Sequence, residues 1–286
     1  MALDSIITNI DANIALQSLS NTQNQLAVTQ KQISTGYAVA DATDNGAAYA
    51  IAQRVRGDVG ALTSANQQLG NVQGLLGVTN SALNDVSNLM NSARDVLVKL
   101  ADGNTQGTQR TQYVTQYQSL VANIKSDIQN ADYNGKTLIG NISGSVGTIG
   151  AVNVVTNEVG STYNIGTFSG SKLYASINFQ ATTQLGNATT VAGLISNGTG
   201  ATFMNKFNAL ATQMNTYGSA TNFVTNQINY NSDKITSLND GLGALVDANL
   251  AQESAKLQAL QIQQQLGTQA LSIANQAPSS LLSLFR

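Results

Sequence analysis

The side chains best suited to chemistry in this sequence are its few carboxylates. Asp41 and Asp44 lie three residues apart in a loop-like segment, where they could bind a cation or could cap a helix and solvate the loop. Asp247 and Glu253 lie six residues apart, so on one helix they face different directions and make a poor general acid–base pair. Capping and solvation are therefore the roles we expect for all four.

The residue types that the chain lacks exclude most other chemistry. Its 286 residues include no histidine and no cysteine, so a Ser-His-Asp triad, a cysteine nucleophile and a His/Cys zinc site cannot form within it. The glycine-rich stretch 144–150 has neither the P-loop lysine nor the Rossmann spacing. The sequence therefore predicts no enzyme, no metal site and no cofactor.

The composition narrows the class of partner. Charged residues make up 10% and the net charge is −2, so there is no basic patch for nucleic acid. The sequence contains no run of 18 apolar residues, so it predicts no transmembrane helix. Residues 1–13 have no basic region, no continuous apolar region and no small-residue cleavage site, so they do not predict a cleaved secretory signal peptide. Because no side chain has an ordinary pKa near neutrality, we expect stability to be flat between about pH 6 and 8.

Two long amphipathic helices are predicted at the chain ends, over 1–36 and 244–276, each about 50 Å long. On each helix the apolar residues form a narrow stripe and the opposite face is polar, which is typical of coiled coils and of helices that neighbouring molecules bury. We predict that the two helices pair and that the stripes drive assembly. The predicted assembly residues are Leu3, Ile7, Ile10, Ile14, Leu19, Leu26, Ile33, Leu250, Leu257, Leu260, Leu271, Ile273, Leu284 and Phe285.

The same pattern places stops and joints along the chain. Gly36 is a C-terminal stop for the first helix, Gly241 and Gly243 mark a joint, and Pro278 ends the last helix. Further helices are predicted over 57–100, 108–132 and 201–240. The first of these contains Gly57, Gly60, Gly70, Gly74 and Gly77, which close packing against a neighbour would explain.

Asn134-Gly135 is a turn signal, after which the composition changes. Strands are predicted over 151–156, 162–168 and 172–179. The fold class is thus mainly α, with long terminal helices pairing as an antiparallel coiled coil, a helical second domain and a small β insert. The predicted domains are 1–40 with 244–286, 41–135 with 201–243, and the insert 136–200.

Several segments resemble one known family. Segments 33–36 (ISTG) and 40–52 (ADATDNGAAYAIA) resemble the signature that follows the first helix of bacterial flagellins. Segment 131–138 (ADYNGKTL) is similar to the turn into that family's variable region, and 247–286 resembles the flagellin C-terminal helix throughout. The resemblance covers residues 1–135 and 201–286. The short chain and its SLLSLFR ending are similar to those of alphaproteobacterial flagellins.

The resemblance implies a structural subunit that assembles with itself into the flagellar filament used for swimming, outside the cell. It implies export of the unfolded chain by the flagellar type III apparatus, and contacts with a chaperone, the filament cap and hook-junction proteins. Some flagellins activate Toll-like receptor 5 through two arginines one residue apart before an acidic residue. Here Arg94 and Asp95 fit but Ser92 replaces the first arginine, which argues against activation.

Two alternatives stay open. A hook-filament junction protein would share the terminal helices without forming long polymers. A flagellin-like surface binding protein, or adhesin, would hold a carbohydrate or host ligand on its insert, where Tyr163, Tyr174 and Phe179 could form a stacking platform.

Overall fold

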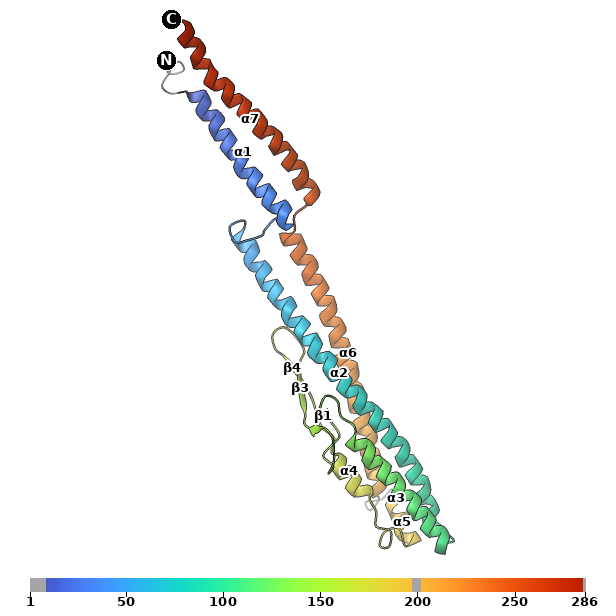
Figure 1. Cartoon of the computed structure of the whole chain (residues 1–286). Coiled ribbons are helices and arrows are strands. Elements are labelled where there is room, and N and C mark those ends of the chain that lie inside the picture. The colour runs from blue at the N-terminus through green and yellow to red at the C-terminus, as the bar shows by residue number, and fades with distance from the viewer. Residues whose placement is uncertain (1–8, 197–201, 285–286) are drawn as a thin grey trace. The chain divides into compact units, whose positions relative to one another are not determined.

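A computed structural model describes residues 9–196 and 202–284, with side chains in the last helix described up to residue 276. The helices in these residues are α1 (Ile10–Thr35), α2 (Gly46–Ala101), α3 (Gly107–Gln129), α4 (Gly170–Ile177), α5 (Ala188–Ile195), α6 (Thr202–Val246) and α7 (Leu250–Leu284). The strands are β1 (Lys136–Thr137), β2 (Thr148–Ile149), β3 (Val152–Val155) and β4 (Thr162–Ile165) (Figure 1). The mainly α fold class is confirmed.

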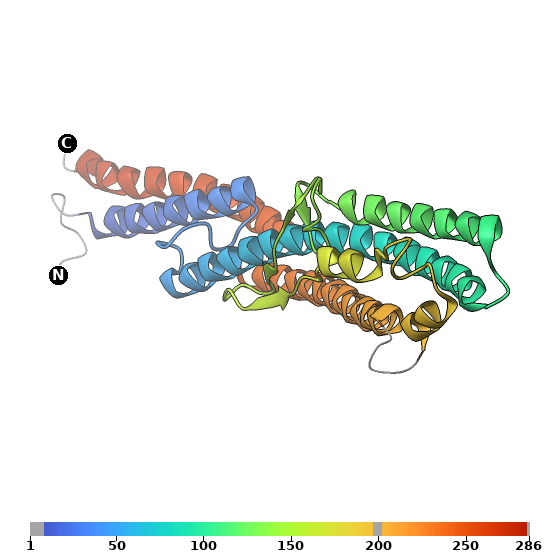
Figure 2. The same ribbon diagram turned by 90° about the horizontal axis from the view of Figure 1, so that it is seen from below.

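The chain forms two compact units, Met1–Asp58 with Thr236–Arg286 and Val59–Ile235. In the first unit, α1 lies alongside α7 (Figures 1 and 2). Asn9 at the start of α1 donates to the carbonyl of Ala274 near the end of α7, whereas Gly36 after α1 accepts from the amide of Ala248 before α7. The two terminal helices are therefore antiparallel, as predicted.

Both ends of α1 follow from local sequence. The side chain of Asn9 accepts a hydrogen bond from the amide of Ala12, which caps the N-terminus. Gly36 ends the helix in the left-handed conformation, with φ 76°, and its amide donates to the carbonyl of Gln32. The predicted stop at Gly36 is confirmed, while the predicted helix over 1–8 lies outside the described residues.

In the second unit, α2, α3 and α6 bury one apolar core. Polar side chains also link α2 to α6: Gln73 donates to Thr225 and Asn80 donates to Thr221, both at 3.1 Å. The hydroxyl of Tyr217 on α6 donates to carbonyls of the segment that follows α3, at Leu138 and Gly166. Helices distant in sequence are thus tied to one another and to the insert.

The insert contains less β structure than predicted. β3 and β4 form an antiparallel hairpin and β1 pairs with β2 in parallel. The strand predicted over 172–179 is wrong, because this segment forms α4, which Ser169 caps through the amide of Lys172. Leu173 and Ile177, four residues apart, bury the same face of that helix. The prediction failed because a short apolar segment can fit either a strand or a helix, and here its apolar residues follow the helical period.

The Asn134-Gly135 turn is confirmed. Both residues have positive φ, 50° and 75°, and Tyr133 and Lys136 exchange backbone hydrogen bonds across them. This is the backbone arrangement of a two-residue hairpin turn.

Two breaks were placed wrongly. α6 continues through Gly241 and Gly243 to Val246, so α7 begins at Leu250 and not at 244. α7 also continues past Pro278 to Leu284. A proline in a helix interior costs about 3 kcal/mol or more and a helical glycine about 1 kcal/mol relative to alanine, yet α6 and α7 continue through these residues.

The explanation of the α2 glycines holds at one position. A Cβ on Gly74 would lie 2.7–2.9 Å from ring atoms of Tyr133. A Cβ on Gly57, Gly60, Gly70 or Gly77 would meet nothing within 4 Å. Only Gly74 is therefore explained by close packing.

Candidate assembly interface

The seam between α1 and α7 is defined here by the half-buried and buried positions that recur at steps of three and four on both helices. This is the a/d spacing of a coiled coil. On α1 the seam consists of Ala12, Ala15, Leu19, Thr22, Leu26, Thr29 and Ile33. On α7 it consists of Glu253, Leu257, Leu260, Gln264, Gly267, Leu271 and Ala274.

The seam is poor in large apolar side chains. Leu19 is 8% exposed and Leu260 is 4% exposed, but alanine, threonine, glutamine and glycine occupy half of the positions. Thr29 is fully buried, and no partner for its hydroxyl is found among the described residues. Such a pair buries little apolar area for its length.

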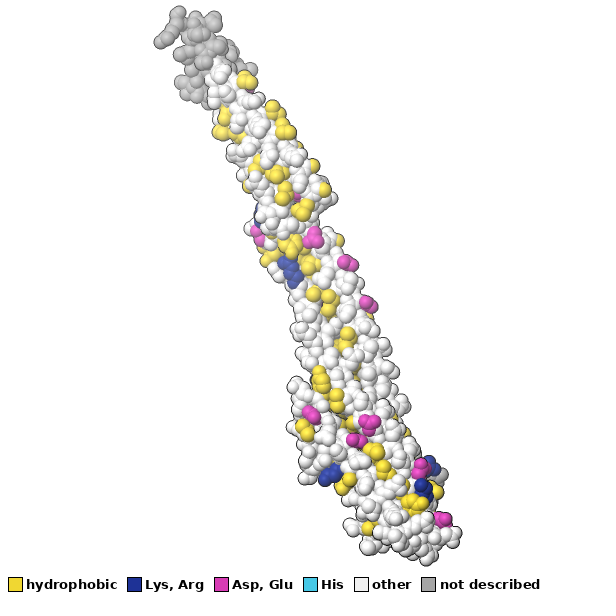
Figure 3. Space-filling model, turned by 45° about the vertical axis from the view of Figure 1, so that its right-hand side comes forward, with side chains coloured by type: hydrophobic (Ala, Val, Ile, Leu, Met, Phe, Trp, Pro, Cys, Tyr) yellow, Lys and Arg dark blue, Asp and Glu magenta, His cyan; other side chains and the backbone are white. Residues whose placement is uncertain are grey.

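A second set of apolar side chains points away from the seam, and we call it the outer apolar face. Its spacing is again close to heptads, since Ile14 and Val28 lie fourteen residues apart and Leu266 and Ile273 lie seven apart. Its members are Ile10, Ile14 and Val28 on α1 and Ile262, Leu266 and Ile273 on α7, with exposures between 42% and 70%. Leu16, which is 53% exposed, lies two residues from Ile14 and therefore projects from another side of α1. Figure 3 shows apolar side chains and almost no charged ones on this part of the chain.

The two helices also enclose a groove of about 520 Å³. Ile14 and Ala15 line it from α1, and Ala270 and Ile273 line it from α7. The outer apolar face is therefore continuous across both helices at this point.

The predicted assembly residues divide among these surfaces. Leu19, Leu26, Ile33, Leu257, Leu260 and Leu271 lie in the seam. Ile10, Ile14, Leu250 and Ile273 are exposed. Leu3, Ile7 and Phe285 lie outside the described residues, as does the side chain of Leu284.

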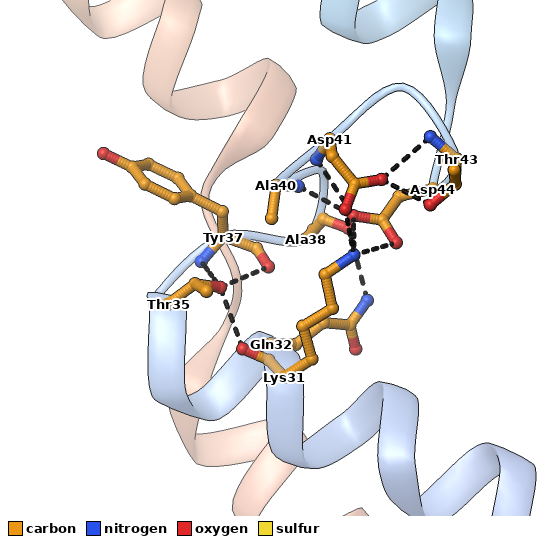
Figure 4. A network of polar contacts seen from close by, with 9 residues as sticks. All are labelled: Lys31, Gln32, Thr35, Tyr37, Ala38, Ala40, Asp41, Thr43 and Asp44. Atoms are coloured by element: carbon orange, nitrogen blue, oxygen red, sulfur yellow. Dashed lines mark hydrogen bonds and ion pairs between the residues drawn. The ribbon is translucent and has the colours of Figure 1, made fainter.

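A polar cluster that the sequence did not reveal holds the loop after α1 (Figure 4). The ammonium of Lys31 lies 2.7 Å from Asp41 Oδ2 and 2.8 Å from Asp44 Oδ1. Asp44 also accepts from the amides of Ala40 and Asp41, and Asp41 accepts from the amide and hydroxyl of Thr43. One lysine thus pairs with both of the carboxylates that the sequence offered as a cation site.

The cluster shifts the ionisation of its members. The hydrogen bond from Lys31 holds the pKa of Asp41 and of Asp44 below the usual value, and the bond to Asp41 raises the pKa of Lys31. Lys31 and the two acids are ten and thirteen residues apart. No helical or strand period connects such positions, so their spacing could not predict the cluster.

The same loop pairs with the segment between α6 and α7. The amide of Ala38 donates to Val246 O at 2.7 Å, and the amide of Ala248 donates to Gly36 O at 2.9 Å. The guanidinium of Arg56 lies 5.6 Å from the ring centre of Tyr37. Backbone pairing, an ion-pair cluster and a cation–π contact therefore all fix this connection.

The aromatic platform considered for the insert does not form. Phe179 is buried and stacks on Tyr117, Tyr163 stacks on Phe223, and Tyr174 lies near the ammonium of Lys125. The three rings serve separate contacts.

Helical end segments that pair over a thin seam and present a second apolar face are typical of a structural protein that assembles with other subunits. The comparisons agree. The family model for the bacterial flagellin N-terminal helical region matches residues 6–143, and that for the C-terminal helical region matches 202–285. The chain therefore belongs to the bacterial flagellin family.

Relatives match along the whole chain. Flagellin FljM of Caulobacter vibrioides is 34% identical over 290 residues, covering 100% of both chains. A flagellin of Brucella melitensis is 34% identical over 296 residues, covering 99% of both. A solved structure of a flagellar hook-associated protein from Vibrio parahaemolyticus has a TM-score of 0.51 at 16% identity, covering 71% of this chain and all of that one. This last likeness shows the fold alone.

The family is one of structural proteins, and this chain is a structural subunit of the extracellular flagellar filament. Among the described residues, no helix combines the length and the apolar character needed to cross a membrane.

Proposed function

We propose that copies of this chain assemble into an open helical filament through the outer apolar face of α1 and α7. A contact between different surfaces of identical subunits, repeated without closure, generates such a filament. The observation that carries the proposal is the exposure of Ile14, Leu266 and Ile273, at 58–70%. Exposed apolar stripes at heptad spacing favour burial by another helix.

The thin seam explains why assembly and ordering are coupled. The α1–α7 pair buries few large side chains internally, so its stability depends on neighbours that cover the outer face. We propose that 1–40 with 244–286 forms the inner assembly domain, that 41–135 with 201–243 forms a rod domain, and that 136–200 is the variable insert.

We also propose the finer features that accompany flagellin assembly. The chain is exported unfolded, without a cleaved signal peptide, by the flagellar type III apparatus with a chaperone. It then contacts the filament cap and hook-junction proteins. It performs no catalysis, and Ser92 in place of an arginine weakens any recognition by Toll-like receptor 5.

Negative-stain electron microscopy tests the proposal. The purified full-length chain is concentrated and a precipitating salt such as ammonium sulfate is added. We expect long filaments of uniform width. Persistent monomers, with the mass of the full-length chain confirmed, would contradict self-assembly and favour a junction protein or a surface binding protein.

A further inference from the structure

Gly267 occupies an unexpected place in α7. It is the single glycine between Leu250 and Leu284, and glycine disfavours a helix interior relative to alanine. It is absent from the glycines with positive φ, so its own backbone conformation does not require glycine. The reason for it must lie in what packs against it.

Leu19 of α1 packs against this glycine. A Cβ on Gly267 would lie 3.2 Å from Leu19 Cδ1, 3.8 Å from Leu19 Cβ and 4.0 Å from Leu19 Cα. The last distance shows that the two backbones approach closely here. Leu19 is also the one buried apolar side chain among the residues of α1. The leucine therefore sits over a gap in the side chains of α7.

Several of the other seam positions distinguish one register from another only weakly. Ala12, Ala15 and Ala274 are small and Gln264 is polar and long, so sliding α1 along α7 by one heptad changes few of their contacts. The backbone hydrogen bonds at Gly36 and Ala38 oppose such a slide at the loop end of the pair. The same slide would move Leu19 from Gly267 onto Leu260 or Ala274, where a side chain already occupies the space. Asn9, which donates to Ala274 O at 2.7 Å, would lose its partner.

We propose that the contact between Leu19 and Gly267, together with the backbone hydrogen bonds of Gly36 and Ala38 at the loop end, determines the register of the terminal helix pair. In that register Ile14 and Ile273 line one groove, so the outer apolar faces of the two helices form a single surface. A slipped pair would separate them. The consequence for assembly rests on the proposed function, whereas the register itself does not.

The first test compares glycine-to-alanine changes. Helix propensity alone predicts that Gly267→Ala raises the temperature of unfolding, as we expect for the control Gly241→Ala, where a Cβ meets nothing within 4 Å. We expect Gly267→Ala to lower it, and Leu19→Ala with Gly267→Ala to unfold higher than the two single changes predict together. A stabilised Gly267→Ala would overturn the proposal.

The second test reads the register directly and does not depend on stability. Because the chain has no native cysteine, introduced pairs report cleanly with a short bifunctional reagent. Ala15→Cys with Ala270→Cys reports the observed register, and Ala15→Cys with Gln263→Cys reports a slip of one heptad. We expect Gly267→Ala to reduce the first cross-link and increase the second, on the full-length chain with and without ammonium sulfate.

The outcomes separate the two proposals. Filaments that form from Gly267→Ala with an unchanged first cross-link would overturn the register proposal and leave self-assembly standing. In the other case, the Ala15→Cys/Ala270→Cys cross-link forms when Gly267 is present and is lost when Gly267→Ala is added, but neither protein forms filaments. That result supports the register proposal and contradicts self-assembly.

Discussion

At the scale of single residues, Lys31 stabilises the loop that connects α1 to α2. Its ammonium is the cation for two carboxylates, and those carboxylates accept the amides of Ala40, Asp41 and Thr43. Without it, Asp41 and Asp44 would repel each other across a loop of ten residues between Thr35 and Gly46. We therefore expect Lys31→Gln to expose those three amides.

The acid dependence follows from the same cluster. Lys31 lowers the pKa of Asp41 and Asp44 in the folded chain, below the unfolded value of about 3.9. Their ionisation therefore stabilises the loop fully above that value, and the contribution is lost only as pH falls through the lower folded pKa. We expect the loop amides to stay protected at about pH 4 in the native chain and to lose protection at higher pH in Lys31→Gln.

Amide hydrogen exchange, corrected for the intrinsic rate at each pH, measures this. Lys256→Gln is the matched control, because within the described part of the chain Lys256 pairs with Glu253 alone, three residues away on α7, and its loss should leave the loop amides unchanged. Equal protection in Lys31→Gln and the native chain would show that the backbone pairing with Val246 and Ala248 suffices.

Thr29 gives a second prediction at this scale. Its side chain is fully buried in the seam, and its hydroxyl has no partner in the described part of the chain. Such a group costs about 1–3 kcal/mol, so Thr29→Val should raise the free energy of unfolding by about 1 kcal/mol. Thr22→Val is the control, because its hydroxyl donates to Ser18 O and its loss should bring no gain. Chemical denaturation of both variants decides, and a destabilised Thr29→Val would contradict the prediction.

At the scale of elements, the sequence predicted the features that depend on the spacing of apolar residues. The long helices and the pairing of the two ends follow from heptad spacing, and Gly36 and Asn134-Gly135 acted as stop and turn because both need positive φ. Gly241, Gly243 and Pro278 were read as breaks, yet long helices absorb them. Local signals alone do not reveal whether tertiary packing offsets a weak position.

The seam was partly visible for the same reason. Leu19, Leu26 and Ile33 stand at steps of seven, but the positions between them, such as Thr22 and Thr29, are polar and gave no apolar signal. They were recoverable as the residues three beyond each leucine. Lys31 was not recoverable, because its partners depend on how the loop folds back onto α1.

The glycines of α2 provide a prediction about an element. Gly70→Ala and Gly77→Ala should each raise the free energy of unfolding by up to about 1 kcal/mol, since a Cβ there meets nothing within 4 Å. Gly74→Ala should lower it, because the new Cβ would displace the ring of Tyr133 beside the Asn134-Gly135 turn. Thermal unfolding of the three variants tests the order. A Gly74→Ala chain as stable as the other two would mean that the ring moves aside at no cost.

At the scale of the whole molecule, the low charge content suits repeated contact between copies of the chain. Only 10% of the residues are charged, so copies that pack against one another meet little like-charge repulsion. With no histidine in the chain, no side chain has an ordinary pKa near neutrality, so we expect that contact to change little between about pH 6 and 8.

Assembly and folding of the single chain should respond to different positions on the same helices. Leu266 and Ile273 are 58% and 70% exposed, so replacing either with serine removes little from the isolated chain. Burial of such a side chain contributes about 1.5–3 kcal/mol, and each 1.4 kcal/mol is about tenfold in affinity. Leu266→Ser and Ile273→Ser should therefore raise the critical concentration for filament formation about tenfold or more, with an unchanged temperature of unfolding.

The contrasting variant is Leu260→Ala in the seam, where the side chain is 4% exposed. It should lower the temperature of unfolding of the isolated chain, because it opens a cavity between α1 and α7. Sedimentation of filaments at graded protein concentrations, with thermal unfolding of each monomer, measures both quantities. If the serine variants polymerised like the native chain, subunits would have to meet through another surface, and the outer apolar face would need a different occupant.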